Sequence, residues 1–426
     1  MVIRNRGRVV SVAKRYVVGA VAAGLVACAG RSVSAPPEPS PNAADAAVVR
    51  VALGTSPSIS LGAAGDWQVT DRDGRVVASG GARDAVTISA SGGGIDVAAD
   101  GASPRAVSAP LSMAVQRGDA IVSVEGRHYH GALSIIAADS GLRILNRVPV
   151  EQYLRGVVPR ELGTRDPRDR AALEAQAIAA RSYVVTRLGN ATRGFDVTAT
   201  TSDQVYGGVG AENSAADAAV AATAGLVLMY NGRIVNAPYH STCGGSTAAP
   251  SEVWGSTDSP YLRAVSDRIP GSDRSYCDIA PRFRWERSWR SDTLAAVVER
   301  YIRAYASVTS DSVGAIRSVE VDGHTASGRV ATLWIETDRG RYRLQRNDIR
   351  YVLRSPGGEL LNSTYFSPEV ARSPDGRLTR LTIRGLGYGH GVGMCQWGAV
   401  GRARAGQDFR TILRTYYPGT TVARAY

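Results

Sequence analysis

The feature that most constrains this chain is the stretch GLGYGHGVGMCQWGAVG, in which glycine occupies every second position from Gly385 to Gly393. Glycine packs no side chain and loses the most backbone entropy on folding, so a regular repeat of it needs a structural reason. A period of two predicts a strand with one bare face, whose other face carries Tyr388, His390 and Val392. A sheet corner and the wall of a polysaccharide cleft are the alternatives. A phosphate loop is disfavoured because G-x-x-x-x-G-K-[ST] is absent.

The N-terminus predicts export. Five basic residues precede an apolar run, Tyr16 to Ala27, which is too short to span a bilayer comfortably, so residues 1–28 are interpreted as a secretory signal peptide. Its end, Leu-Val-Ala-Cys28, resembles a bacterial lipobox and predicts lipidation of Cys28, with ordinary cleavage nearby as the alternative. Residues 29–47, which contain APPEPSPNAADAA, predict a disordered linker. We therefore expect an extracytoplasmic lipoprotein held to a membrane of the cell envelope.

The net charge indicates which classes of partner to expect, and the cysteines indicate the redox state. A formal net charge of +12 suits anionic wall polymers or lipid head groups. No cluster of basic residues interleaved with aromatics occurs, so no nucleic-acid partner is predicted. Export places the cysteines in an oxidising compartment. A disulfide between Cys243 and Cys277 is the first hypothesis, although connectivity cannot be read from a sequence.

The pattern of apolar residues predicts an α+β fold. Residues 48–147 consist of short strand patterns and turns, including a hairpin turn at 71–74, and predict a β-rich module that packs on the next region. Residues 148–426 contain a few helices and mostly antiparallel strands, without the alternation that a parallel sheet requires. Apolar spacing and capping residues predict four helices, which cover 150–157 before Pro159, 167–188 after the N-cap Asp166, 294–305 and 409–417.

Glu161 is the first catalytic candidate. It lies in VVPREL, between the proline that is predicted to end one helix and the cap of the next. Its apolar neighbours Val157, Val158 and Leu162 would raise its pKa if they enclose it, which suits a general acid near neutral pH. The alternative is a solvated loop glutamate.

Two stretches place histidine near cysteine, namely YHSTCGGST with His240 and Cys243, and GHGVGMCQW with His390 and Cys395. A thiol nucleophile is one interpretation, but export favours a disulfide. The spacings form no known set of four zinc ligands, and C-x-x-C is absent, so neither metal nor cofactor is predicted.

Several long motifs occur in an order that resembles the SpoIID/LytB domain, the stage II sporulation protein D family. They are VPVEQYLRGVVPREL, ALEAQAIAARSYVVTRL, FDVTATTSDQVYGG and AVAATAGLVLMYNGRIVNAPYHSTCGG. GLGYGHGVGMCQWGA and ILRTYYPGT resemble the closing motifs of that family. The resemblance covers the chain from about residue 48 and identifies 148–426 as a SpoIID/LytB-like catalytic domain.

The resemblance implies a peptidoglycan lytic transglycosylase. Such an enzyme cleaves the β-1,4 bond between N-acetylmuramic acid and N-acetylglucosamine in peptide-denuded glycan strands and leaves 1,6-anhydro ends. Glu161 occupies the catalytic position of the G-V-V-x-x-E motif. The implied substrate-binding residues are Gln176, Arg181, Ser182, Tyr183, Gln204, Tyr206, His240, Ser241, Gly244, Gly245, His390 and Gln396.

Two properties vary within the family. Some members bind zinc through Cys and His just before Q-V-Y, but here residues 200–203 read Thr-Thr-Ser-Asp, so no metal is predicted there. LytB-like members stimulate a cell-wall amidase rather than cut glycan. The alternative function is therefore a non-catalytic, glycan-binding enhancer of an amidase.

Overall fold

The structure is a computed structural model that describes residues 47–426 except 93, 100, 101, 117–119 and 191. The predicted signal peptide, Cys28 and all but the last residue of the predicted linker lie outside the described residues. Among the helices that are described, none combines the length and the apolar character needed to cross a membrane.

The first part of the described chain consists of strands. They are β1 (Val48–Ser56), β2 (Ser58–Ala63), β3 (Trp67–Thr70), β4 (Val76–Gly80), β5 (Val86–Ser91), β6 (Gly94–Ala99), β7 (Arg105–Val107), β8 (Leu111–Val115), β9 (Ile121–Val124), β10 (Arg127–His130), β11 (Ala132–Ala138) and β12 (Gly141–Pro149).

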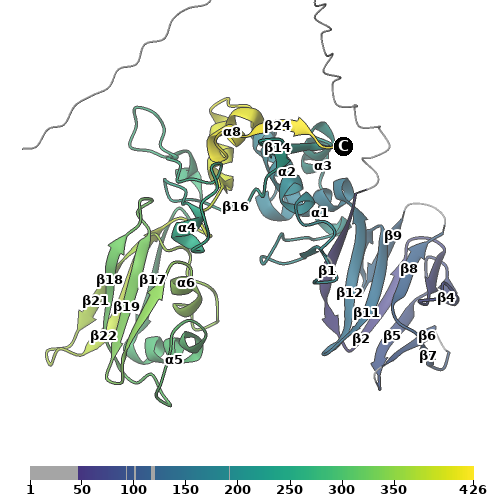
Figure 1. Ribbon diagram of the computed structural model, residues 1–426, viewed down its shortest axis with the longest axis horizontal. Helices are drawn as coiled ribbons and strands as arrows, with labels where there is room; N and C mark the ends of the chain where they lie inside the picture. Colours follow the sequence, from purple (N-terminus) through teal and green to yellow (C-terminus); the bar gives the residue numbers. More distant parts are fainter. Residues whose placement is uncertain (1–46, 93, 100–101, 117–119, 191) are drawn as a thin grey trace, which may run out of the picture. The chain divides into compact units, whose positions relative to one another are not determined.

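These strands form two sheets, and β1, β12 and β11 lie side by side in one of them (Figure 1). That sheet has the order β13-β1-β12-β11-β8-β3-β4, and the other has the order β10-β9-β2-β5-β6-β7. The pairs are antiparallel except that β13 (Val197–Thr198) runs parallel to β1. Alternate residues such as Leu133 and Ile135 are buried, as expected for strands with one face on a core. The predicted turn at 71–74 joins β3 to β4.

Helices and short strands follow. The helices are α1 (Val150–Leu162), α2 (Arg170–Val185), α3 (Ser214–Ala222), α4 (Pro250–Val253), α5 (Ser291–Tyr301), α6 (Asp348–Val352), α7 (Gln396–Arg404) and α8 (Phe409–Tyr416), with 3₁₀ turns η2 (Pro167–Asp169), η3 (Val209–Ala211), η4 (Tyr276–Ile279) and η5 (Ile302–Ala304). The remaining strands are β14 (Leu226–Tyr230), β15 (Arg233–Ile234), β16 (Tyr239–His240), β17 (Arg284–Arg290), β18 (Ile316–His324), β19 (Val330–Thr337), β20 (Arg341–Gln345), β21 (Phe366–Arg372), β22 (Leu378–Leu386), β23 (Met394–Cys395) and β24 (Thr421–Arg424). The fold class is α+β, as predicted.

The first helix differs from its prediction. It does not end at Pro159 but continues through it to Leu162, so Glu161 lies in the last helical turn rather than in a loop. A proline inside a helix removes one backbone N–H. The helix nevertheless continues for three more residues, with Pro159 buried and its carbonyl oxygen accepting the N–H of Gly163 at 2.8 Å.

The second helix is close to its prediction. Asp166 caps η2 by accepting the N–H of Arg168, and α2 follows directly. It ends at Val185, and residues 186–189 form a turn instead of the predicted last helical residues.

Two hydrophobic cores organise the described residues. The first contains side chains of the two large sheets together with α1 and α2, including Leu133, Tyr153 and Ala177. The β-rich part therefore packs on the helices that follow it. The second core lies between residues 289 and 383 and includes Leu294 of α5 and Leu333 of β19. It lies inside the region predicted to be one catalytic domain.

The glycine repeat is not the predicted strand. Strand β22 ends at Leu386, and the repeat beyond it alternates in backbone handedness, because every second residue has a positive φ. These residues are Gly387 (φ 79°), Gly389 (φ 112°), Gly391 (φ 90°) and Gly393 (φ 72°). Only glycine adopts this region of φ without a steric cost. The period of two therefore reflects alternating φ, and not the pleat of a strand.

Candidate active site

The carboxyl group of Glu161 is half-buried at the C-terminal end of α1. Its Oε1 atom accepts the backbone N–H of Val205 at 2.8 Å, and its Oε2 atom accepts a hydrogen bond from Nε2 of Gln396 at 3.3 Å. Burial raises the pKa of Glu161, and hydrogen bonds from Val205, Gln396 and Tyr239 partly oppose this rise. The group thus holds a proton more readily than a solvated glutamate while remaining partly exposed.

Amide side chains from three separate segments belong to one hydrogen-bonded network with this carboxyl group. Gln396 opens α7 and also donates to Oε1 of Gln176, on α2, at 3.4 Å. The Nε2 atom of Gln176 is buried and has no hydrogen-bond partner among the described residues. Gln204 donates to the hydroxyl of Tyr239 at 2.8 Å. The structure therefore links three of the predicted glutamines to Glu161, Gln396 directly, Gln176 through Gln396 and Gln204 through Tyr239.

Sequence reasoning missed two of the contacts to Glu161. Val205 contributes only its backbone N–H, and a contact of this kind cannot be predicted from a residue pattern. Tyr239 precedes the predicted residue His240 and pairs with Met394 in the parallel bridge of β16 with β23. Its position beside a glycine-rich motif was the available signal.

Three predicted substrate-binding residues point instead into the protein. Arg181 is fully buried, and its guanidinium donates to both carboxylate oxygens of Glu151 at 2.8 and 2.7 Å. Ser182 donates to the carbonyl of Ile178 and accepts the N–H of Leu228. Tyr206 is buried and donates to Oδ1 of Asn146 at 3.0 Å. Their polar groups are satisfied within the fold.

The half-buried Tyr183 lies closer to the surface. Its hydroxyl donates to Oδ1 of Asp203 at 3.1 Å, and the guanidinium carbon of Arg187 lies 3.3 Å from its ring centre. The centre of its ring is 6.5 Å from that of Tyr239. Tyr183 therefore lies beside Tyr239, a neighbour of Glu161, but its hydroxyl bonds to Asp203 and not to Glu161.

Replacing Tyr206 with phenylalanine tests its structural role. We expect a loss of about 1 kcal/mol in the free energy of unfolding, because one buried hydrogen bond to Asn146 is removed. Urea denaturation measures this loss. Glycan binding should stay unchanged, and weaker binding at wild-type stability would instead return Tyr206 to the substrate site.

The two predicted histidines lie together, and no hydrogen bond joins either of them to Glu161 among the described residues. The ring centres of His240 and His390 are 5.4 Å apart, and Trp254 lies 5.1 Å from His390. Burial, with Arg350 nearby, lowers the pKa of His390 to about 3, and burial also lowers the pKa of His240. Both rings are therefore neutral at physiological pH. Gln396, and not His390, provides the hydrogen bond to the Glu161 carboxylate.

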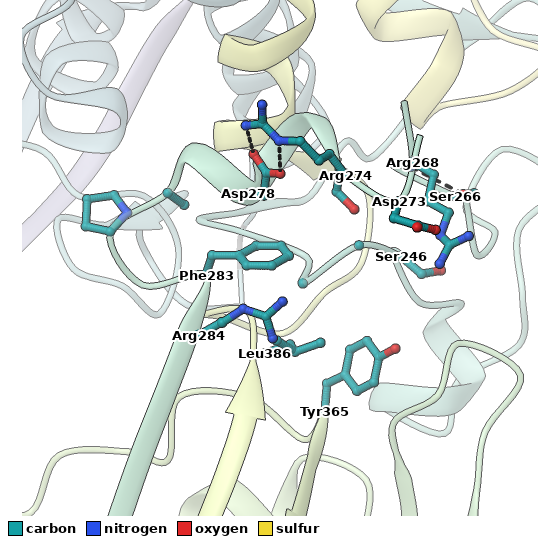
Figure 2. Close-up of a pocket in the computed structure, with 15 residues that line it drawn as sticks. Ser246, Ser266, Arg268, Asp273, Arg274, Asp278, Phe283, Arg284, Tyr365 and Leu386 are labelled. Carbon is teal, nitrogen blue, oxygen red and sulfur yellow. Dashed lines mark hydrogen bonds and ion pairs between the residues drawn. The ribbon is translucent and has the colours of Figure 1, made fainter. Parts of the chain in front are cut away.

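Two of the remaining predicted residues border a cavity of about 780 Å³. Gly244 and Gly245 line it, and Figure 2 shows Phe283, Arg284 and Tyr365 around the same space. Arg268 and Arg274 also face it, and Arg274 is paired with Asp278. Ser241 lies nearby in the chain, and its carbonyl oxygen accepts the N–H of Trp397. Guanidinium groups and aromatic rings together suit polar ligands with apolar faces, such as sugars.

The predicted disulfide is not formed. The Sγ atoms of Cys243 and Cys277 are 3.4 Å apart, whereas bonded sulfurs lie about 2.05 Å apart. Cys395 joins them, so three buried free cysteines meet at one place. The zinc position that some family members use does not fit this chain, because Thr200 to Asp203 contains no thiol or imidazole. Asp203 instead accepts hydrogen bonds from Thr198 and Tyr183.

Comparisons with known proteins agree with the predicted resemblance. The family model described as stage II sporulation protein (SpoIID) matches residues 138–230. A second model, for a domain of unknown function (DUF8618), matches residues 271–393, a range that overlaps the second core.

Three relatives illustrate the similarity. The chain is 34% identical over 292 residues to the amidase enhancer of Bacillus subtilis (strain 168). The aligned region covers 63% of this chain but only 40% of that protein. It is 31% identical over 302 residues to an uncharacterized protein of Brachyspira hyodysenteriae, covering 70% of this chain and 73% of the relative. It is 31% identical over 300 residues to the stage II sporulation protein D of Bacillus subtilis (strain 168), covering 66% of this chain and 76% of that protein. On this evidence the chain belongs to the SpoIID family.

Proposed function

We propose that this protein is a peptidoglycan lytic transglycosylase that acts on peptide-denuded glycan strands, with Glu161 as its single acid and base. The observation that carries the proposal is the state of that carboxyl group. It is half-buried, its pKa is raised by burial, and it lies among amide side chains rather than in open solvent. A general acid needs this combination of a retained proton and access to the substrate.

One carboxyl group suffices for the proposed reaction. Glu161 donates its proton to the bridging oxygen as the bond from that oxygen to the anomeric carbon of N-acetylmuramic acid breaks. The oxocarbenium-like centre is attacked by the 6-hydroxyl of the same sugar, and the Glu161 carboxylate takes the proton that this hydroxyl loses. The products are a 1,6-anhydro end and a free 4-hydroxyl, and no water is consumed. The internal nucleophile supplies a high effective concentration.

Several groups elsewhere in the structure can contact the sugar chain. The indole of Trp254 is 44% exposed and lies beside the neutral ring of His390, which makes an aromatic surface for a sugar face. The cavity beside Gly244 and Gly245 offers guanidinium groups to hydroxyl or carboxylate oxygens.

Replacing Gln396 with alanine should shift the pH dependence of this activity. The hydrogen bond from Gln396 lowers the pKa of Glu161, so its removal should raise that pKa further. The reaction requires the protonated acid, so the loss of kcat/KM with rising pH should move to higher pH. The measurement is kcat/KM for denuded glycan as a function of pH. Gln345→Ala in β20 is the matched control, and equal profiles for wild type and Gln396→Ala would contradict the role given to Gln396.

We also propose the cell-envelope setting that the N-terminus predicts. Residues 1–28 would direct export, Cys28 would carry the lipid anchor, and residues 29–47 would separate the anchor from a β-rich module (48–147) and the catalytic region (148–426). Labelling with a radioactive fatty acid, compared between wild type and Cys28→Ser, tests the anchor. Label retained by the variant would contradict it.

A second function is a non-catalytic enhancer of a cell-wall amidase, which is favoured by the similarity to a protein named amidase enhancer. In that case the same groups would bind glycan without cutting it. Mass spectrometry of denuded glycan after incubation with the purified protein separates the two. The enhancer function is favoured if 1,6-anhydro products are absent while a purified amidase releases stem peptides faster in the presence of the protein.

A further inference from the structure

Three buried cysteine thiols and one buried carboxyl group lie close together, and Glu161 is not among them. They are Cys243, which follows β16, Asp267, Cys277 in η4, and Cys395 at the end of β23. Their three sulfur atoms and one carboxylate oxygen all lie within 4.8 Å of one another. The four residues come from separate parts of the sequence, so only the fold brings them together.

The distances suit a shared cation better than a covalent bond. Sγ of Cys243 is 3.4 Å from Sγ of Cys277 and 3.7 Å from Oδ2 of Asp267. Zinc–sulfur bonds are about 2.3 Å long, so two thiolates on a tetrahedral zinc ion lie about 3.8 Å apart. The observed spacing is close to this value.

Groups around the cluster orient the carboxylate toward the thiols. Oδ1 of Asp267 accepts hydrogen bonds from the hydroxyl of Tyr416 at 2.7 Å and from Nη2 of Arg402 at 3.1 Å. This leaves Oδ2 on the side of the sulfur atoms. A side chain at Gly398 would lie 2.6 Å from Oδ2, so glycine is needed there for the carboxylate to approach. Hydrogen-bonded carboxylates of this kind are typical of metal ligands.

One of the sulfur atoms is placed as an acceptor. Sγ of Cys395 accepts the backbone N–H groups of Cys243 and Gly398, both at 3.2 Å. Cys395 is the N-cap residue of α7, where the helix dipole favours a negative charge. The sulfur of Cys395 is thus fixed in position by two backbone N–H groups, at a distance from the other three side chains that suits a shared ligand position.

We propose that Cys243, Asp267, Cys277 and Cys395 bind one zinc ion in a closed, four-coordinate structural site. Thiolates favour zinc over magnesium and calcium, and four protein ligands leave no open position for a substrate. Metal binding requires the thiolate form, and three thiolates and a carboxylate this close together would repel one another without a cation between them. The zinc ion offsets this repulsion, and the thiols release their protons to solvent as it binds.

Such a site would join three segments, one of which carries a residue of the candidate active site. It links the loop after β16, the turn η4 and the start of α7, which carries Gln396 directly after Cys395. The proposal concerns these four residues alone and does not depend on the glycan reaction.

The test uses the full chain with Cys28→Ser, so that the three cluster cysteines are its only thiols. The protein is purified without chelators, and its metal content is measured by inductively coupled plasma mass spectrometry. We expect about one zinc per chain. After removal of zinc and addition of Co²⁺, we expect the visible bands of tetrahedral cobalt and an ultraviolet thiolate-to-cobalt band.

A pair of tyrosine variants tests the arrangement without removing a ligand. Tyr416→Phe loses the hydrogen bond to Asp267 and should weaken Co²⁺ affinity about tenfold, as outer contacts of metal ligands do. Tyr206→Phe removes a buried hydroxyl elsewhere and should leave the affinity unchanged. Equal affinities in the two variants would overturn the proposed role of Asp267.

Two results would overturn the site itself. One is a chain 2 Da lighter than its reduced mass, with one thiol and no zinc, which means that two of the cysteines form a disulfide. The other is a fully reduced chain that takes up neither zinc nor cobalt.

Discussion

Replacing Glu161 with glutamine is expected to lower the rate of 1,6-anhydro product formation by about 10²- to 10⁴-fold, the usual cost of losing one positioned acid or base. Glutamine has nearly the same shape and can still accept the N–H of Val205, but it has no proton to donate to the glycosidic oxygen. The measurement is mass spectrometry of products from peptide-denuded glycan at several times.

The lower rate of Glu161→Gln should not result from a less stable protein. A carboxyl group whose pKa is raised on folding stabilises the protein only in its protonated form, and this contribution is lost as the pH rises through the raised pKa. At neutral pH the uncharged glutamine therefore removes no such stabilisation. We expect the thermal midpoint of Glu161→Gln at pH 7 to equal or exceed that of the wild type.

A matched control is Glu174→Gln on the neighbouring helix α2, where the carboxylate pairs with Arg170. It should retain most of the activity. Cleavage by Glu161→Gln at the wild-type rate would rule out the transglycosylase mechanism, whereas equal losses in both variants would indicate a general disturbance of the helices.

The second large effect is expected at the glycine repeat. Gly393 has a φ of 72°, and a side chain there would overlap the carbonyl oxygen of Pro238. Gly393→Ala should therefore lower the free energy of unfolding by about 2–5 kcal/mol, from the unfavourable φ together with the steric overlap. Urea denaturation measures the change.

The control is Gly406→Ala, because this glycine has a φ of 84° and open space around it. It carries the conformational cost alone, about 1–2 kcal/mol. The difference between the two variants isolates the close approach of the two backbones. Equal losses would mean that the segment around Pro238 moves aside without cost.

Local patterns predicted four of the eight helices in the described residues, namely α1, α2, α5 and α8. The helix at 409–417 is confirmed as α8, and the turn at 71–74 is confirmed between β3 and β4, because capping and turn residues act within a few positions of the chain. Pro159 shows where such rules fail. The proline and the preceding Val157 and Val158 are buried, and the helix continues past Pro159 to Leu162, so the residue that usually ends a helix did not do so here.

The glycine repeat shows a different kind of failure. Period two was interpreted as a strand, but alternating φ yields the same spacing of glycines. Only the neighbouring backbone at Pro238, together with the bridge between Thr242 and Tyr388, distinguishes the two.

The sequence by itself determined the family, the α+β class and the choice of Glu161 as the residue to examine, because these rest on motifs and on short-range apolar spacing. Only the tertiary structure decided that Gln396, 235 positions away, bonds to that carboxyl group, and that three cysteines and Asp267 share one buried place. The reason is physical. Burial raises the pKa of a carboxyl group and decides which side chains a thiol meets. The segments that bury these groups are far apart in the sequence.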